Sequence, residues 1–177
     1  MTCIVGLVDN NKVYIGGDSA GVSGHDITIR RDEKVFANGH FLMGFTTSFR
    51  MGQLLRYELK VPEQPEDMDD FKYMVTIFIK AVRECLGEGG FLKKNNEVES
   101  GGSFLVGYKG RLYEIDDDYQ VGSAVDNVLA VGCGAKVALG AMYASTGDPV
   151  GRIRKALEIS ERLSGGVRSP FLIKSQE

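Results

Sequence analysis

The second residue of the chain, Thr2, combines a side chain and a position that together could do chemistry. Removal of the initiator methionine, which is usual before a small residue, would leave a free α-amine on Thr2. An N-terminal threonine carries a nucleophilic hydroxyl and also a base, because its amine, with a pKa of about 8, can take the hydroxyl proton directly or through a water. The position therefore predicts a nucleophile, against the alternative of an ordinary strand residue.

A hydroxyl of this kind needs a cation beside it, and Asp18 and Lys34 are the candidates for an aspartate and a lysine at this place. Asp18 follows Thr2 by sixteen residues, and Lys34 follows Asp18 by another sixteen. Asn10-Asn11 tolerates the positive φ angles of a two-residue hairpin turn, and the register of that hairpin brings Thr2 beside Asp18. A lysine there would lower the cost of the alkoxide, and an aspartate would hold the lysine in place and keep it charged. The alternatives are a turn residue and a solvated strand end.

The order and spacing of several short segments resemble the proteasome β-subunits and HslV-type peptidases, which are threonine members of the N-terminal-nucleophile hydrolases. The segments are Thr2, Gly16-Gly17-Asp18-Ser19-Ala20-Gly21, Asp32-Glu33-Lys34-Val35-Phe36, Met43-Gly44-Phe45, Gly132-Cys133-Gly134 and Glu161-Arg162-Leu163-Ser164-Gly165-Gly166. The resemblance spans nearly the whole chain. It implies an α+β fold, the four-layer αββα sandwich, in which two stacked sheets lie between two helix layers.

The resemblance also implies roles for four residues beyond the first three. The amide of Gly44 would line an oxyanion hole, and Cys133, Glu161 and Ser164 would support the N-terminal amine and its proton traffic. Cys133 stands where the family has serine, and Glu161 stands where it has aspartate. Each has a plainer interpretation: Gly44 as a packing glycine, Cys133 as a small buried thiol, and Glu161 and Ser164 as a helix end running into two glycines.

The activity that the resemblance implies is cleavage of polypeptides by a threonine peptidase inside a closed ring, often with an unfolding ATPase as partner. Two alternatives stay open. One is a non-catalytic structural or assembly protein of the same fold that keeps Met1, and the other is an amidase acting on a small amide. Cys3 could become an N-terminal nucleophile only if Thr2 were also lost.

Composition narrows the class of protein further. The chain has 177 residues, 43% hydrophobic and 25% charged, with a net charge of −3, which favours one compact domain over residues 1–177 and disfavours a nucleic-acid binder. Three cysteines without a CxxC pair, together with two histidines, predict neither a disulfide framework nor a metal site, and favour a reducing, cytoplasmic setting. No segment indicates a membrane span, and no cofactor is expected. Asp116-Asp117-Asp118 is predicted as a solvated turn, with a weak cation site as the alternative.

The predicted elements alternate between hairpins and helix pairs. Strands are expected at Thr2–Val8, Lys12–Gly17, Ile27–Ile29, Lys34–Ala37, Phe41–Phe45, Ser103–Tyr108, Arg111–Ile115, Tyr119–Val121, Val128–Val131 and Pro170–Lys174. Helices are expected at Ser48–Leu59, Asp69–Leu86, Ala135–Ala144 and Val150–Arg162, and the segment Gly87–Gly102 is expected to be a mobile loop. The first strands are apolar on both faces, which is typical of a sheet covered on both sides.

Overall fold

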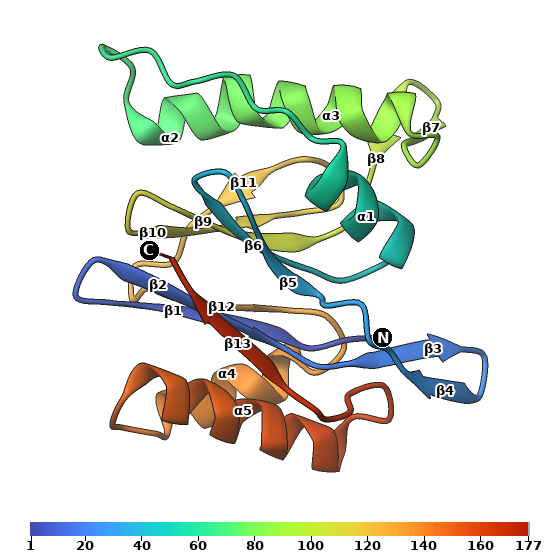
Figure 1. Ribbon diagram of the computed structural model, residues 1–177, viewed down its shortest axis with the longest axis vertical. Coiled ribbons are helices and arrows are strands. Elements are labelled where there is room, and N and C mark those ends of the chain that lie inside the picture. Colours follow the sequence, from blue (N-terminus) through green and yellow to red (C-terminus); the bar gives the residue numbers. More distant parts are fainter. Residues whose placement is uncertain (177) are drawn as a thin grey trace.

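Two antiparallel β-sheets packed face to face form the centre of the molecule in a computed structural model that describes residues 1–176 (Figure 1). The four-stranded sheet has the order β12 (Val128–Val131), β1 (Ile4–Asp9), β2 (Lys12–Gly17), β13 (Leu172–Ser175). The five-stranded sheet has the order β11 (Val121–Gly122), β10 (Arg111–Ile115), β9 (Phe104–Tyr108), β6 (Phe41–Phe45), β5 (Val35–Asn38). Two separate hairpins are β3 (Ala20–Ser23) with β4 (Asp26–Ile29), and β7 (Lys93–Asn95) with β8 (Val98–Ser100).

The first hairpin forms as its turn residues predict. Asn10 and Asn11 have φ angles of 48° and 60°, the left-handed values that a tight two-residue hairpin requires. Asp9 pairs with Lys12 and Ile4 with Gly17, so the predicted register is confirmed. This register brings the residues just before β1, including Thr2, next to Asp18, which follows β2.

Helices cover both outer faces of the sheet pair (Figure 1). Over the five-stranded sheet lie α1 (Phe49–Tyr57), α2 (Asp70–Tyr73), a π-helical segment η1 (Met74–Phe78) and α3 (Ile79–Glu88). Over the four-stranded sheet lie α4 (Ala135–Tyr143) and α5 (Pro149–Leu163). The result is the predicted αββα sandwich. None of the helices in the described part of the chain is both long enough and apolar enough to cross a bilayer.

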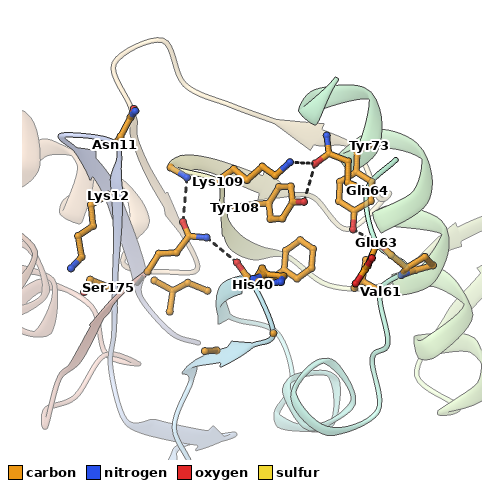
Figure 2. A pocket seen from close by; sticks show the side chains of 17 residues that line it. Asn11, Lys12, His40, Val61, Glu63, Gln64, Tyr73, Tyr108, Lys109 and Ser175 are labelled. Atoms are coloured by element: carbon orange, nitrogen blue, oxygen red, sulfur yellow. Dashed lines mark hydrogen bonds between the residues drawn. The ribbon is translucent and has the colours of Figure 1, made fainter. Parts of the chain in front are cut away.

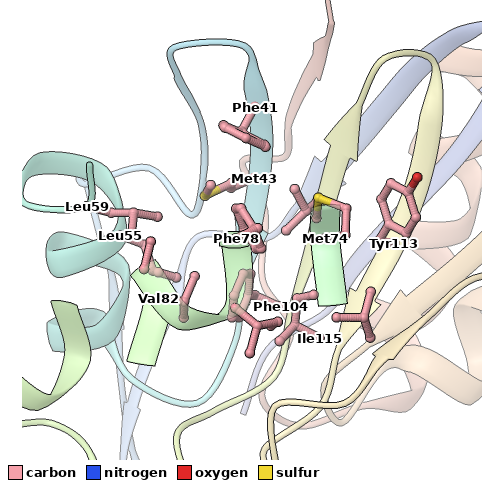
Figure 3. Packing of buried hydrophobic residues seen from close by; sticks show 14 of the residues in the cluster. Phe41, Met43, Leu55, Leu59, Met74, Phe78, Val82, Phe104, Tyr113 and Ile115 are labelled. Carbon is pink, nitrogen blue, oxygen red and sulfur yellow. The ribbon is translucent and has the colours of Figure 1, made fainter. Parts of the chain in front are cut away.

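Three apolar layers separate the four layers of secondary structure. The layer between the sheets contains Ile4, Ile15, Val35 and Leu105, among others. A second layer joins the four-stranded sheet to α4 and α5. The largest lies under α1–α3 and is rich in aromatic residues, as Figure 3 shows. Because β1 and β2 are buried on both faces, their lack of a polar face is explained.

The long helix predicted over Asp69–Leu86 exists, but its packing face differs at the N-terminal end. The i, i+3, i+4 spacing of apolar residues predicts Phe71 and Val75 on the buried face of this helix, but both are exposed, whereas Tyr73 is buried. The π-helical turn η1 inserts one residue between the two halves of the helix, so the apolar face N-terminal to it is rotated relative to an ideal α-helix. Periodicity alone could not reveal this turn.

The segment Gly87–Gly102, expected to be a loop, contains secondary structure instead. Its first two residues complete α3, and β7 and β8 form a short hairpin with Lys94 opposite Glu99. The turn residues of this hairpin, Asn96 and Glu97, have φ angles of 47° and 68°. An Asn-initiated turn was the available signal, but the polar strands around it lack the alternation by which a strand is recognised.

Candidate active site

Thr2, Asp18 and Lys34 meet at one end of the sandwich. The Lys34 ammonium donates to Thr2 Oγ1 at 3.0 Å and to Asp18 Oδ1 at 2.9 Å. The Lys34 and Asp18 side chains are 1% and 0% exposed, and Thr2 is also buried. The hairpin of β1 and β2 places Thr2 beside Asp18, and Lys34, immediately before β5, reaches them from the other sheet. The structure thus brings the three residues together.

The Asp18 carboxylate is fully engaged as an acceptor. Oδ1 also accepts from the backbone N–H of Cys3 at 3.0 Å, and Oδ2 accepts from the N–H groups of Ala20 at 2.9 Å and Arg168 at 3.3 Å. These donors fix the orientation of the carboxylate. Of them, the Arg168 contact joins positions 150 residues apart, which nothing in the local sequence signals.

Burial and charge act in opposite directions on Lys34. Removal from water lowers the pKa of its ammonium group below the ordinary lysine value, and the adjacent Asp18 carboxylate partly restores it. A lysine held in this way donates a hydrogen bond to Thr2 Oγ1 and stabilises negative charge that develops on that oxygen. Cys3, which is close by, is poorly suited to act as a thiolate, because burial raises the pKa of its thiol to about 12.

Cys133 contacts both backbone polar groups of Thr2. The Thr2 N–H donates to Cys133 Sγ at 3.3 Å, and the thiol donates to the Thr2 carbonyl at 3.4 Å. Gly134 N–H donates to the same carbonyl at 3.2 Å. Gly132 has φ +97°, and a Cβ there would lie 2.3 Å from the Thr2 carbonyl oxygen, so only glycine fits. This loop therefore positions the atom that would become the free amine.

Met1 still precedes Thr2, so the Thr2 nitrogen belongs to a peptide bond. The Thr2 hydroxyl donates to the Met1 carbonyl oxygen. The Met1 side chain is 58% exposed and lies against Gly166, where an added Cβ would come 2.2 Å from the Cβ of Met1. Met1 therefore lies between the Thr2 hydroxyl and Gly166.

Glu161 and Ser164 stabilise a loop near the site without a hydrogen bond to Thr2. Glu161 Oε1 accepts from Ser169 N–H at 2.8 Å and from its hydroxyl at 3.1 Å. The Ser164 carbonyl accepts from Val167 N–H at 3.2 Å and from the Arg168 guanidinium at 3.4 Å. The same loop presents the Arg168 amide to Asp18. The two residues therefore act on the site indirectly.

Gly44 occupies a packing position, and the oxyanion role expected of its amide needs correction. It pairs with Val35 on one side and Leu105 on the other, so its backbone polar groups point along the sheet to neighbouring strands. A Cβ there would lie 2.6 Å from Ile4 Cγ2 and 2.8 Å from Ile15 Cγ2. Both a packing glycine and an oxyanion glycine sit between apolar residues, and the sequence could not separate them.

A free amide is found three residues further on, at Thr47. It has φ +63°, and its N–H has no acceptor among residues 1–176, whereas Thr46 and Ser48 on either side both donate to backbone carbonyls. Thr46 is close to Thr2, because both residues surround Gly132. A Cβ added at Gly132 would lie 2.3 Å from the Thr2 carbonyl oxygen and 3.3 Å from Thr46 Cγ2. The polar run after a buried strand was the signal in the sequence for this loop.

A large cavity lies at the other end of the sandwich from Thr2. It has a volume of about 880 Å³ and is lined by the turns after β1, β5 and β9 and by the segment Val61–Gln64 (Figure 2). Thr2 and Asn11 are nine strand residues apart, roughly 30 Å at 3.3 Å per residue. Its polar side chains bond to one another, since Gln64 Oε1 accepts from both Tyr108 and Lys109. The cavity is therefore separate from the cluster of Thr2, Asp18 and Lys34.

No group of three or more histidine, cysteine, aspartate or glutamate side chains within residues 1–176 is arranged to hold a metal ion. Asp116 to Asp118 form a turn in which Gln120 N–H donates to Asp118 Oδ1 at 2.9 Å. The acidic run is thus placed as predicted for a turn.

Comparison with solved structures confirms the fold. The chain superposes on Thiobacillus denitrificans BPH, alone and in complex with epoxomicin, with a TM-score of 0.81 and 18% identity, covering 99% of this chain and 98% of the other. It superposes on eukaryotic HslV from Trypanosoma brucei with a TM-score of 0.68 and 18% identity, covering 98% of both chains. No protein-family model and no curated protein matches the sequence. The likeness extends over nearly the whole length, as expected for the αββα sandwich of HslV and proteasome-like proteins.

Proposed function

We propose that the protein is a threonine peptidase of the proteasome-like type that cleaves polypeptides after removal of Met1. The observation that carries the proposal is the buried Lys34 ammonium, which bridges Thr2 Oγ1 and the Asp18 carboxylate. A buried ion pair is a weak source of stability, because removing two charges from water offsets their attraction. Its position on the hydroxyl of the second residue points to chemistry.

In the proposed reaction, Thr2 Oγ1 attacks the carbonyl carbon of a peptide bond. The hydroxyl proton passes to the free Thr2 amine and from there to the leaving nitrogen, while Lys34 stabilises the alkoxide. The Thr47 amide, instead of that of Gly44, binds the tetrahedral oxyanion. Collapse breaks the C–N bond and leaves an ester on Thr2. Water, activated by the same amine, hydrolyses the ester and regenerates the hydroxyl.

Removal of Met1 is the condition for this mechanism. While Met1 is attached, the Thr2 nitrogen is an amide and cannot serve as a base. Hydrolysis of the Met1–Thr2 bond would leave the amine next to Cys133 Sγ, 3.3 Å from the nitrogen. A chain that retains Met1 would instead be the non-catalytic structural member of the fold. The intact mass of the purified protein separates the two: a mass short by one methionine supports the enzyme.

The test of activity is hydrolysis of fluorogenic peptides by the processed protein. Thr2→Ala is expected to abolish turnover with the fold intact, and the matched control Thr28→Ala, at an exposed position of β4, is expected to leave turnover unchanged. Undiminished turnover by Thr2→Ala would refute the mechanism. Epoxomicin, which BPH binds, is a second probe: it is expected to raise the melting temperature of the processed protein but not of Thr2→Ala. Turnover of a small amide without turnover of peptides would favour an amidase.

Self-association into a ring, with an unfolding ATPase as partner, belongs to the same proposal. Analytical ultracentrifugation tests this: a monomer at micromolar concentration would contradict the ring.

A further inference from the structure

A second cation lies on the same aromatic ring as Lys34. The Arg30 guanidinium stacks over the Phe49 ring, with its carbon 4.1 Å from the ring centroid. The Lys34 ammonium lies 5.6 Å from the centroid of the same ring. Lys34 Nζ is 3.0 Å from Thr2 Oγ1, so Arg30 shares an aromatic neighbour with the cation that contacts the hydroxyl.

The guanidinium of Arg30 is fixed in orientation by Asp32. Its Nε and NH2 atoms donate to the two carboxylate oxygens of Asp32, each at 2.7 Å. The NH1 group has no acceptor among residues 1–176, and the side chain is 37% exposed. The Asp32 pair therefore leaves the NH1 edge of the planar fork open, and a guanidinium edge fits a carboxylate better than any other common side chain does.

The surroundings also make room for Arg30. A Cβ at Gly21, on β3, would lie 3.0 Å from both Cγ and Cδ of Arg30, so glycine at this position lets the side chain lie across the hairpin. The Arg30 N–H donates to the Ser19 carbonyl at 2.8 Å, and Phe49 packs edge-on against Phe45 at 5.6 Å. Stacking, hydrogen bonding and packing together pre-organise the guanidinium.

A further arginine adds to the positive charge at this end of the sandwich. The Arg168 guanidinium donates through NH1 to the carbonyls of Ser164 and Val167, and no carboxylate pairs with it in the described part of the chain. Asp18 is committed to Lys34, and Asp32 to Arg30. A negatively charged substrate side chain would thus meet two cations, with Asp18 and Asp32 both engaged in ion pairs, although the chain as a whole carries a net charge of −3.

We propose that Arg30 selects substrates with an acidic side chain on the residue whose carbonyl is attacked. The inference rests on the proposed function. That residue stays bonded to Thr2 Oγ1 in the acyl-enzyme, so its side chain remains near Lys34 and Phe49 while the leaving peptide departs. A glutamate carboxylate accepts from the open edge of Arg30, and a glutamine of the same length offers only a neutral amide.

The experiment compares two fluorogenic peptides that differ only in glutamate or glutamine before the scissile bond. Processed wild-type protein is expected to cleave the glutamate peptide with the higher kcat/KM. Arg30→Met is expected to lower kcat/KM for that peptide about tenfold, the size of one lost charge-assisted hydrogen bond, with the glutamine peptide changed less than about twofold. Arg30→Lys, which keeps the charge without the fork, is expected to fall between the two.

A matched control is Arg83→Met, because Arg83 forms the same kind of exposed ion pair, with Glu99, on the opposite helix layer. Arg83→Met is expected to leave kcat/KM unchanged for both peptides. The same two peptides as C-terminal amides, titrated by calorimetry, give a readout that needs no turnover. Tighter binding of the glutamate peptide that is lost in Arg30→Met supports the inference, even if neither peptide is cleaved and the proposed function fails. Equal binding of the two peptides, or a glutamate preference that survives Arg30→Met, overturns it.

Discussion

Replacing Asp18 by asparagine is the sharpest test of the buried pair. The substitution leaves the Lys34 ammonium buried with Thr2 Oγ1 as its remaining neutral acceptor. Asparagine also offers one acceptor oxygen where the carboxylate offers two, so its amide N–H groups must face backbone donors such as Ala20 or Cys3. The variant therefore has a buried ammonium without its counterion and backbone N–H groups without their acceptor.

The expected magnitude is large. Removing one partner of a buried ion pair costs about 3–5 kcal/mol, out of a total stability of about 5–15 kcal/mol for a folded protein. For a chain of this size, 1 kcal/mol shifts the melting temperature by about 2–4 °C, so we expect Asp18→Asn to lower it by about 6–20 °C. Lys34→Met is expected to cost less, because the remaining carboxylate keeps three backbone N–H donors.

The assay is a double-mutant cycle measured by chemical denaturation. We expect Asp18→Asn with Lys34→Met to be less destabilising than the sum of the single substitutions, with a coupling of about 1–3 kcal/mol. Glu99→Gln, which breaks the exposed pair with Arg83, serves as the control and is expected to cost less than about 1 kcal/mol. Additive effects, or an Asp18→Asn loss no larger than that of the control, would refute the reasoning. All variants of Asp18 and Lys34 should lack peptidase turnover.

Four further predictions concern the same site. Activity should fall as the pH rises, and the fall should begin at a lower pH than the ordinary pKa of lysine, because burial lowers the pKa of Lys34 and its protonated form is the active one. A pH profile of kcat checks this. The unfolded chain binds this proton more tightly than the folded one, so stability should rise with pH between the two pKa values, as denaturation at a series of pH values would show. Cys133→Ser should raise kcat a few-fold in the processed protein, because a hydroxyl is a stronger hydrogen-bond partner for the amine than a thiol; unchanged steady-state turnover would speak against contact with the amine. Gly132→Ala should lower the free energy of unfolding by about 2 kcal/mol or more and abolish turnover, since φ +97° and the Thr2 carbonyl exclude a Cβ. Chemical denaturation measures this change, and a smaller loss of stability would contradict the prediction.

The part of the site that could be predicted is the part encoded by local geometry. The turn at Asn10-Asn11 sets the hairpin register, and the register sets Thr2 beside Asp18. This signal is strong because a slip of one residue would reverse every side chain of the strand. Lys34 was predicted through the resemblance of its segment to the HslV-type peptidases, and the structure brings it to Thr2 and Asp18.

The parts that could not be predicted depend on packing between distant segments. The Arg168 amide reaches Asp18 from a loop 150 residues away, and the bulk of Ile4 and Ile15 decides that Gly44 is a packing residue. The rotation of the helix at Phe71 follows from one inserted residue in η1. In each case the sequence is compatible with two arrangements, and only the neighbouring element selects one.

The cost of burying Lys34 bears on whether the site is used. An apolar pair of similar volume in place of Lys34 and Asp18 would be as stable or more stable, since desolvation offsets most of the attraction between buried charges. The fold itself therefore gains little from the pair, yet three backbone amides are arranged to hold the Asp18 carboxylate. The pair stabilises the sandwich little, and Lys34 donates a hydrogen bond to the hydroxyl of Thr2. The negative charge that this hydroxyl must carry when it attacks a carbonyl carbon explains the arrangement. Retention of Met1 in the mature protein would remove that explanation, and the intact mass is for this reason the first measurement to make.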